Sequence, residues 1–544
     1  MKKIVALVLC MAMVLSLAAC GGSKTSTAPA QSGTTTPAPS AAPAAPAESE
    51  YKDTLTYAIN TDIQDIDPQI QNDTTSENVV KMLYNTLLKF QDDGTVVGDL
   101  AKEWSVSDDK LTWTFKLNEG VKFHDGSELT SDDVKASFER AMNAPAGALR
   151  TTEIVKMFEK VEVVDKYTVT ITTSEPYGPM ESLLCNMQTG ILDDATIAKW
   201  GYDEITSNLE AENGTGPFTL ESWTRDQEIV IKRFDDYFGT PAKLETVVYT
   251  VIPEAASRAI ALENEEVDVI SSPTAEDLAR LEADTENYTV IRRPSVGQRL
   301  FRFGCNDPII SNTLVRQAIV YTIDRQVIID ALFQGLGYPN TAPLAPVTFG
   351  YSDLGGIEKD LDKAKELLAK AGYPNGFDTK IVTTSRYQYG VEMAEILKEQ
   401  LAEVGINAEV EVWEWSALSA SWSGVTPEEF DQPIFIMGAG PSMRDADGGL
   451  RGLYTTTENG LNDRNYGFYS NARVDELITA GMQETDPAKR IEIYKEAMEI
   501  LYREDPVAFW LYDQYGMVVT SSKVEGVNLS PISTVTFEAA TVKK

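Results

Sequence analysis

Histidine is almost absent from this sequence of 544 residues, in which His124 is the only one. Zinc-protease motifs need paired histidines, the serine triad needs a histidine base, and the chain also contains no Gly-x-Ser-x-Gly nucleophile elbow. His124 precedes an Asp-Gly turn, where we expect a structural role and no catalytic or ligand role. The sequence therefore predicts a protein that is not an enzyme, with no metal site and no cofactor.

Cysteine is nearly as scarce as histidine. Cys10 and Cys20 lie in the N-terminal leader, which leaves Cys185 and Cys305 far apart in the chain. This distribution excludes a disulfide framework of the kind that holds small secreted domains together. We expect two separately buried thiols, and a single bridge between them is the alternative.

No hydrophobic run is long enough to span a membrane, because the most apolar stretch, residues 4–17, falls short of the ~20 residues that a spanning helix needs. Two lysines precede this stretch, as in an export signal. Leu17-Ala18-Ala19-Cys20 resembles a bacterial lipobox, which implies a signal peptide over residues 1–19 and lipidation of Cys20. An ordinary signal cleaved nearby is the alternative. We expect the mature protein outside the cytoplasm, anchored by lipid to the bacterial cell membrane in the cell-wall zone or periplasm.

The segment that follows the leader, residues 20–50, consists mostly of Ala, Pro, Ser, Thr and Gly. It has no apolar periodicity and cannot bury enough surface to fold. We therefore expect a disordered tether between the lipid and the folded part of the chain.

Positive charge is in short supply, since 47 Lys and Arg face 83 Asp and Glu and the formal net charge is −36. A polyanion has no electrostatic reason to bind nucleic acid or anionic lipid headgroups. The sequence predicts no nucleic-acid partner, contact with the membrane through the lipid anchor only, and a monomer.

The residues beyond the tether exceed the ~250 to 300 at which one core stops growing, so at least two lobes are expected. Strand and helix patterns alternate along this part. Residues 111–117 alternate apolar and polar side chains, and residues 380–412 read as strand, helix and strand, a βαβ unit. Asp486 followed by Pro487 predicts the start of a helix. The fold class is therefore α/β.

Several stretches together resemble the family 5 extracellular solute-binding proteins, the peptide and nickel binders of ABC importers. The resemblance runs in order through most of the chain after Leu55. It rests on Ala101-Lys102-Glu103-Trp104, Phe123-His124-Asp125-Gly126, Asp132-Asp133-Val134, Asn213-Gly214-Thr215-Gly216-Pro217-Phe218, Arg258-Ala259-Ile260-Ala261-Leu262, Val315-Arg316-Gln317-Ala318-Ile319 and Asp362-Lys363-Ala364-Lys365.

The resemblance implies a two-lobed fold like that of periplasmic binding proteins, with mixed sheets, a hinge and a ligand cleft between the lobes. We expect lobe I over residues 51–300, with residues 512–544 returning to it, and lobe II over residues 301–511. The two crossing segments are expected near residues 299–306 and 509–515. A ligand that touches both lobes would favour their closed arrangement.

Candidate ligand-binding residues lie beyond the ends of the predicted strands, where open α/β sheets bind ligands. Arg386 resembles an arginine that dipeptide-binding relatives present to the carboxyl end of their ligand, and Arg444 could grip a carboxylate. For both arginines the alternative is a salt bridge, and for the aromatic candidates it is the core or the surface. The full set is Asn60, Thr61, Arg386, Tyr387, Tyr389, Trp413, Trp415, Gly438, Ala439, Gly440, Ser442 and Arg444.

The resemblance implies a ligand class of short peptides and leaves a metal chelate as the alternative. Many peptide-binding relatives carry an aspartate for the ligand's α-amino group where this chain has Ser442, and residues 441–447 and 468–471 look more like the glutathione-binding branch. We expect capture of short peptides, including glutathione, and their delivery to the permease subunits of an ABC importer. A nickel- or metal-chelate-binding protein of the same family is the alternative, and a structural lipoprotein without transport is a third class.

Overall fold

The structure is a computed structural model, and the chain divides into two units, Met1–Ser49 and Glu50–Lys544, of which the second is described below. The predicted signal peptide, the lipidation of Cys20, almost all of the tether and the candidate Ser442 therefore lie outside the described residues. The structure describes residues 50–71, 73–145, 151, 155–206, 208–333, 337–422, 425–441, 443–456 and 464–544.

A mixed sheet of eleven strands runs through the described part of the chain. β2 is parallel to both of its neighbours, and so is β15, whereas β13 and β18 are antiparallel to each other. In spatial order its strands are β16 (Asn407–Val412), β15 (Asp378–Thr383), β17 (Ile434–Ala439), β13 (Tyr288–Phe303), β18 (Ala508–Ser521), β12 (Val269–Ser271), β2 (Thr54–Ile59), β11 (Thr246–Val251), β10 (Glu228–Arg233) and β9 (Phe218–Thr224), with β14 (Gly337–Pro339) beside β18.

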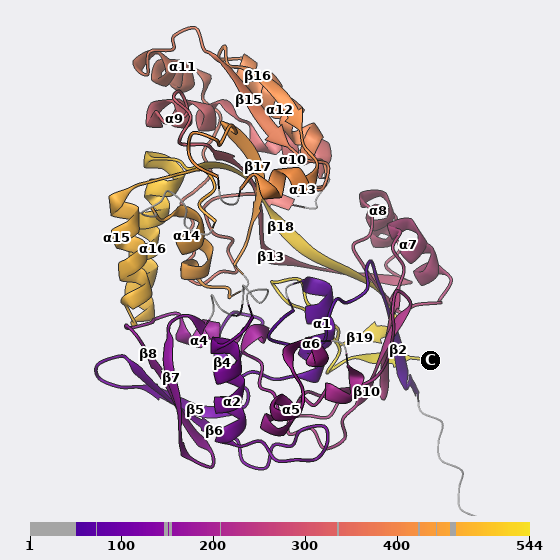
Figure 1. The fold of residues 1–544 in the computed structure, drawn as a ribbon. Coiled ribbons are helices and arrows are strands. Elements are labelled where there is room, and N and C mark those ends of the chain that lie inside the picture. Colours follow the sequence, from indigo (N-terminus) through magenta and orange to yellow (C-terminus); the bar gives the residue numbers. More distant parts are fainter. Residues whose placement is uncertain are drawn as a thin grey trace, which may run out of the picture. The chain divides into compact units, whose positions relative to one another are not determined.

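β13 and β18 are the two long strands of this sheet, and Figure 1 shows them side by side between β17 on one side and β2 on the other. They pair from Tyr288 with Ser521 to Arg302 with Ala508. The register shifts between Pro294 and Gln298, as a bulge does when it bends a strand. The predicted crossing segments, residues 299–306 and 509–515, overlap these two strands.

The remaining strands form four small sheets in the described residues, and the strand predicted over residues 111–117 is present as β6. β1 lies against β22, so the start of the described chain pairs with its C-terminus. These sheets contain β5 (Ala101–Val106), β6 (Thr112–Leu117), β8 (Thr168–Thr173) and β7 (Phe158–Asp165); β1 (Tyr51–Lys52), β22 (Thr541–Lys543) and β19 (Val524–Glu525); β20 (Asn528–Leu529) and β21 (Val535–Thr536); and β3 (Leu88–Phe90) and β4 (Val96–Gly98).

Two helical features predicted from the sequence are present in the structure. The predicted βαβ unit is present as β15, α12 and β16, and α16 begins with Pro487 after the N-cap Asp486. The α-helices are α1 (Thr74–Leu83), α2 (Ser131–Met142), α4 (Met180–Leu183), α5 (Asp194–Lys199), α6 (Tyr202–Ile205), α7 (Ala255–Glu263), α8 (Ala275–Ala283), α9 (Thr313–Thr322), α10 (Arg325–Leu332), α11 (Leu361–Lys370), α12 (Gly390–Ala402), α13 (Trp415–Ala420), α14 (Ala446–Tyr454), α15 (Ala472–Gln483) and α16 (Pro487–Glu499).

Three large hydrophobic cores support these elements. One joins β2 and α1 to the C-terminal strands, a second gathers the four-stranded sheet and α2, and the largest lies around β13, β17, β18 and the helices from α9 to α16. Cys185 and Cys305 are both free, as expected from their separation. Within the described residues, no helix combines the length and the apolar character that a membrane span requires.

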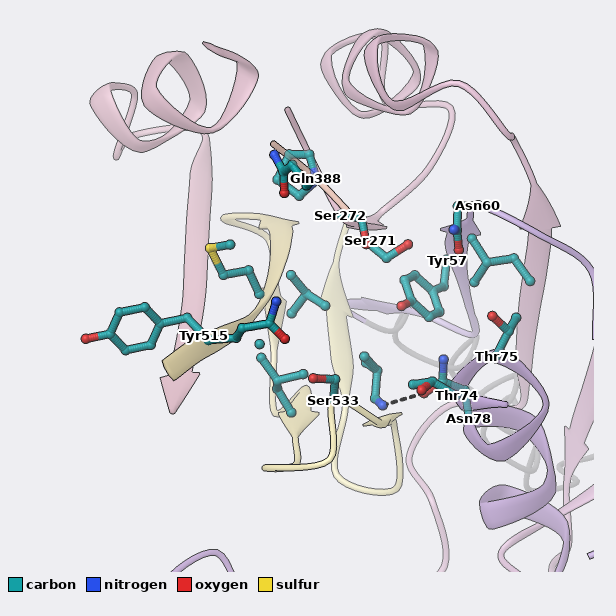
Figure 2. A pocket seen from close by; sticks show the side chains of 18 of the residues that line it. Tyr57, Asn60, Thr74, Thr75, Asn78, Ser271, Ser272, Gln388, Tyr515 and Ser533 are labelled. Atoms are coloured by element: carbon teal, nitrogen blue, oxygen red, sulfur yellow. Dashed lines mark hydrogen bonds between the residues drawn. The ribbon is translucent and has the colours of Figure 1, made fainter. Parts of the chain in front are cut away.

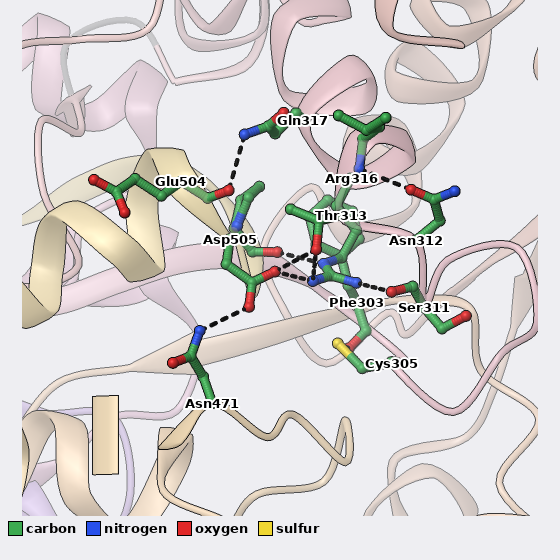
Figure 3. Close-up of polar contacts among 12 residues, drawn as sticks. Phe303, Cys305, Ser311, Asn312, Thr313, Arg316, Gln317, Asn471, Glu504 and Asp505 are labelled. Atoms are coloured by element: carbon green, nitrogen blue, oxygen red, sulfur yellow. Dashed lines mark hydrogen bonds and ion pairs between the residues drawn. The ribbon is translucent and has the colours of Figure 1, made fainter. Parts of the chain in front are cut away.

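The motif around Arg316 is structural, as Figure 3 shows. Arg316 on α9 donates to the main-chain oxygens of Ile310 and Ser311 at 2.8 Å each, to that of Pro506 at 2.8 Å, and forms an ion pair with Asp505. Burial alone would raise the pKa of Asp505, but the charge of Arg316 and hydrogen bonds that include one from Thr313 hold it below its usual value. This network ties α9 to the chain that enters β18.

Candidate functional site

A cavity of about 410 Å³ lies where the C-terminal end of β2, the start of α1, β12 and the middle of β18 come together. Figure 2 shows Tyr57, Asn60, Asn78 and Ser271 around it, with the Asn78 side chain held by the main-chain N–H of Val535 at 2.7 Å. No Asp, Glu, Lys, Arg or His of the described residues lines this cavity. Its walls therefore offer hydrogen bonds without net charge.

A smaller cavity of about 190 Å³ lies between β13, the end of β17 and the start of α14. Gln514 lines both cavities, so the two adjoin at β18. The charged side chains among the described lining residues of the smaller cavity are those of Arg299 and Arg464. We call the two cavities together the central site.

Arg299 is a residue of the central site that sequence reasoning missed as a ligand-binding candidate. It pairs with Gly438 across β13 and β17, and its guanidinium carbon lies 3.9 Å from the centre of the Tyr387 ring. Its Nε is buried without a hydrogen-bond partner in the described part of the chain. A side chain at Gly438 would place its Cβ 2.6 Å from Arg299 Nη1, so the glycine leaves room for this guanidinium. A lone arginine within an apolar-polar strand gives no local signal of this role.

The loop that follows β15 approaches the central site, as the strand-end argument predicts. Gln388 lines the larger cavity and Tyr387 contacts Arg299. Arg386 is exposed and lies over Trp415, with its guanidinium carbon 4.8 Å from the ring centre. Tyr389 packs edge-on against Phe333, a lining residue of the larger cavity, at 5.4 Å between ring centres.

The other aromatic candidates lie behind this loop. Trp415 packs edge-on against Tyr387 at 5.7 Å between ring centres, and also against Trp422. Trp413 borders the same small aromatic core, and its Nε1 donates to Glu411 at 3.1 Å. In the described structure neither tryptophan lines the two cavities, and Trp415 supports Tyr387 through its ring contact.

Most residues of the glycine-rich stretch after β17 lie at the smaller cavity. Gly438, Ala439 and Gly440 line the smaller cavity, and Asn60 lines the larger one. Thr61 is outside the described lining of both. The structure thus brings four of the predicted residues to the central site, together with Tyr387 through its contact with Arg299.

Arg444 lies in a different place from its neighbours in the sequence. It lines a separate cavity of about 400 Å³, which we call the Arg444 cavity. There its guanidinium carbon lies 4.6 Å from the centre of the Phe90 ring, and its Nε donates to the main-chain oxygen of Val347 at 3.4 Å. The hairpin of β20 and β21 lies between this cavity and the central site. Leu529 and Val535 of the hairpin line the larger cavity of the central site, whereas Asn528 lines the Arg444 cavity.

The Arg444 cavity holds charges of both signs. Lys89 forms an ion pair with Asp99 at 2.9 Å, and Asp99 also accepts from the Asn85 side chain at 2.8 Å. Cys185 borders the same cavity, and burial raises the pKa of its thiol well above the usual range, which leaves it inert as a nucleophile.

A buried carboxyl lies directly beneath the central site. Asp513 on β18 accepts hydrogen bonds from the side chains of Gln298 at 2.7 Å and Asn340 at 2.9 Å. Burial raises the pKa of Asp513 to about 7, although both hydrogen bonds act to lower it. Gln298 itself lines the smaller cavity, so it links this carboxyl to the site.

A histidine and a cluster of three aspartates, residue types that often bind metals or take part in catalysis, have structural contacts here. The His124 side chain is 5% exposed, with Nδ1 2.8 Å from the Glu212 carboxylate and Nε2 3.1 Å from the main-chain oxygen of Gly216, and it is outside the described lining of the central site. Asp133, Asp193 and Asp194 come close together, but Asp133 accepts from the main chain of Asp194 at 3.0 Å and Asp193 caps α5. These contacts are structural.

Known proteins resemble the chain over most of its length. The family described as bacterial extracellular solute-binding proteins, family 5 Middle, matches residues 95–460. The glutathione-binding protein GsiB of Salmonella typhi is 31% identical over 454 residues, which cover 83% of this chain and 87% of that protein.

Solved structures share the same mixed α/β periplasmic binding protein fold. HbpA2 from Haemophilus parasuis is 26% identical, with a TM-score of 0.81 over 90% of this chain and 100% of that one. DppA from Helicobacter pylori, solved with the peptide STSA, is 28% identical, with a TM-score of 0.74 over 90% of this chain and 98% of that one. Members of the matched family bind solutes and do not transform them. The chain belongs to the family 5 bacterial extracellular solute-binding proteins.

Proposed function

We propose that this chain is the substrate-binding lipoprotein of an ABC importer and captures short peptides, glutathione among them, in the central site. One observation carries the proposal: the two adjoining cavities lie along β13 and β18, with β2, α1 and β12 on one side and β17 and α14 on the other. These are the strands onto which the predicted crossings fall. A ligand there would touch both predicted lobes and favour their closure, which a permease can read.

The end of β17 supports binding of an extended peptide. β15 pairs with β17 only at Ile434 and Phe435, whereas β13 pairs with β17 as far as Ala439. On the side of β17 that faces β15, the main-chain groups near Met437 and Gly438 therefore lie beyond the end of the β15–β17 pairing. An extended peptide can add itself to such an edge, with main-chain hydrogen bonds that do not depend on its side chains.

The relatives support the same ligand class. The name of the Salmonella protein states glutathione, and the Helicobacter structure contains a four-residue peptide. The lining of the larger cavity, with Asn60, Asn78 and Ser271, supplies the amide and hydroxyl groups that peptide bonds need. No His or Cys among the described residues lines the central site, so its lining does not favour direct ligation of nickel by this chain.

The experiment is to purify the full chain from its membrane fraction, denature it, and identify released small molecules by mass spectrometry. Short peptides in the released fraction, rebound by the refolded protein in titration calorimetry, are the expected result. A metal chelate in their place would contradict the peptide proposal and establish the nickel alternative. Radiolabelled palmitate in the purified protein, lost on Cys20→Ser, is the expected sign of the anchor.

A further inference from the structure

We propose that the central site selects ligands of net negative charge and that Arg299 binds a ligand carboxylate. This inference rests on the proposed function and narrows its ligand class. It follows from the charges around the site, from the state of Arg299, and from the lack of an acidic partner for a ligand ammonium group in the described lining.

The charges around the central site are opposite to those of the whole protein. The chain has 83 acidic and 47 basic residues, yet the described lining of the two cavities contains Arg299 and Arg464 and no Asp or Glu. A buried ammonium group needs a carboxylate or several acceptors to offset its loss of water. The site therefore favours a carboxylate over an ammonium group.

The Arg299 guanidinium is held in position by its neighbours but has no acidic partner in the described structure. The ring of Tyr387 covers one face of the guanidinium, and the absence of a side chain at Gly438 gives Nη1 the space that it occupies. Its buried Nε has no acceptor among the described residues. A carboxylate can accept two parallel N–H bonds from such a fork, which is stronger and more directional than a contact with lysine.

Other arginines in the described structure are used differently. Arg490 is paired with Asp445 at 2.8 Å, and Arg316 is paired with Asp505, each with further main-chain acceptors. Asp513, a carboxyl linked to the site through Gln298, accepts hydrogen bonds from Gln298 and Asn340. No ion pair joins Asp513 to Arg299 in the described structure, so the charge of Arg299 remains available to a ligand.

The class that fits is a short peptide with more carboxylates than ammonium groups. Peptides with an acidic side chain or a γ-linked glutamate belong to this class. Neutral zwitterionic dipeptides would leave their ammonium group without a carboxylate partner in the described lining, and peptides with lysine or arginine would meet two like charges.

The test offers the refolded full chain an equimolar library of tripeptides that includes matched Glu and Gln members, and reads the captured set by mass spectrometry. The wild-type protein is expected to enrich each Glu peptide over its Gln twin by about tenfold. Arg299→Gln should remove this preference, and Arg299→Lys should restore only part of it because lysine lacks the fork.

Arg293→Gln is the matched control. Arg293 lies on the same strand, pairs with Asp92 at 2.9 Å and is outside the described lining of the central site, so the preference should survive. Capture of peptides without a charge preference, or a preference that survives Arg299→Gln in a folded protein, would overturn this inference and leave the proposed function standing. Capture of no peptide at all would instead overturn the proposed function.

Discussion

Two arginines in this protein illustrate opposite uses of the same side chain. Arg316 on α9 is surrounded by acceptors, with the Asp505 carboxylate and three main-chain oxygens around its guanidinium (Figure 3). Arg299 on β13 has a ring beside it and a buried Nε without an acceptor in the described structure. Removing an acceptor from a satisfied buried charge destabilises the fold, whereas a half-buried charge without acceptors at a cavity is available to a ligand. Substitutions at the first should therefore change stability, and substitutions at the second should change binding.

The largest effect is expected for Asp505→Ala. It leaves Arg316 charged and buried without its counterion, and it also removes the acceptor of Thr313 and Asn471. The free energy of unfolding should fall by ~3 kcal/mol, measured by urea unfolding followed by circular dichroism. Glu504→Ala removes a neighbouring exposed charge and serves as the control. Equal stability of the two variants would contradict the role given to this network.

The next effect concerns pH and the carboxyl beneath the central site. The pKa of Asp513 is raised from its usual 3.8 to about 7, so between these values the folded protein holds a proton that the unfolded chain has released. Its contribution to stability is complete below pH ~4 and is lost as the pH rises through about 7, at up to ~1.4 kcal/mol per pH unit.

Asp513→Asn keeps an acceptor for Gln298 and Asn340 and cannot titrate. Urea unfolding at a series of pH values should therefore give a wild-type stability that falls more steeply than that of the variant between pH ~4 and about 7. Parallel curves for the two proteins would show that this carboxyl is not protonated in the folded state.

A smaller effect is expected for Gly438→Ala, which acts on Arg299 without removing its charge. The new Cβ would lie 2.6 Å from Arg299 Nη1 and push the guanidinium aside. Calorimetry should show affinity for an acidic tripeptide reduced by about tenfold, with little loss of stability because a flexible side chain can move. Gly356→Ala, where no atom lies within 4 Å of the added Cβ, is the control. An unchanged affinity would separate Gly438 from ligand binding.

The smallest effect on binding is expected for Arg444→Ala. The sequence suggests a grip on a carboxylate, but this guanidinium lies over Phe90 in a separate cavity behind the β20–β21 hairpin. We expect affinity for the same tripeptide to change by no more than about threefold. A loss as large as that of Arg299→Gln would return Arg444 to the ligand site.

Local patterns in the sequence carry much of this fold. Alternation over residues 111–117 and the strand-helix-strand pattern over residues 380–412 produce β6 and the βαβ unit of β15, α12 and β16. The cap at Asp486 starts α16. These elements follow from interactions between residues a few positions apart, so they can be predicted from the sequence alone.

The central site depends on contacts between residues that are far apart in the sequence. Arg299, Tyr387 and Gly438 meet because β13, β17 and the loop after β15 pack together, although long stretches of chain separate them. No spacing in the sequence marks these three residues as neighbours.

The sequence by itself determined the family and the α/β class, and it predicted the strand ends that border the central site. Only the tertiary structure decided that Arg299 faces the central site and that Arg444 lies in another cavity. The physical reason is that hydrophobic periodicity depends on neighbours along the chain, whereas the availability of a charge depends on every acceptor that folding brings within reach.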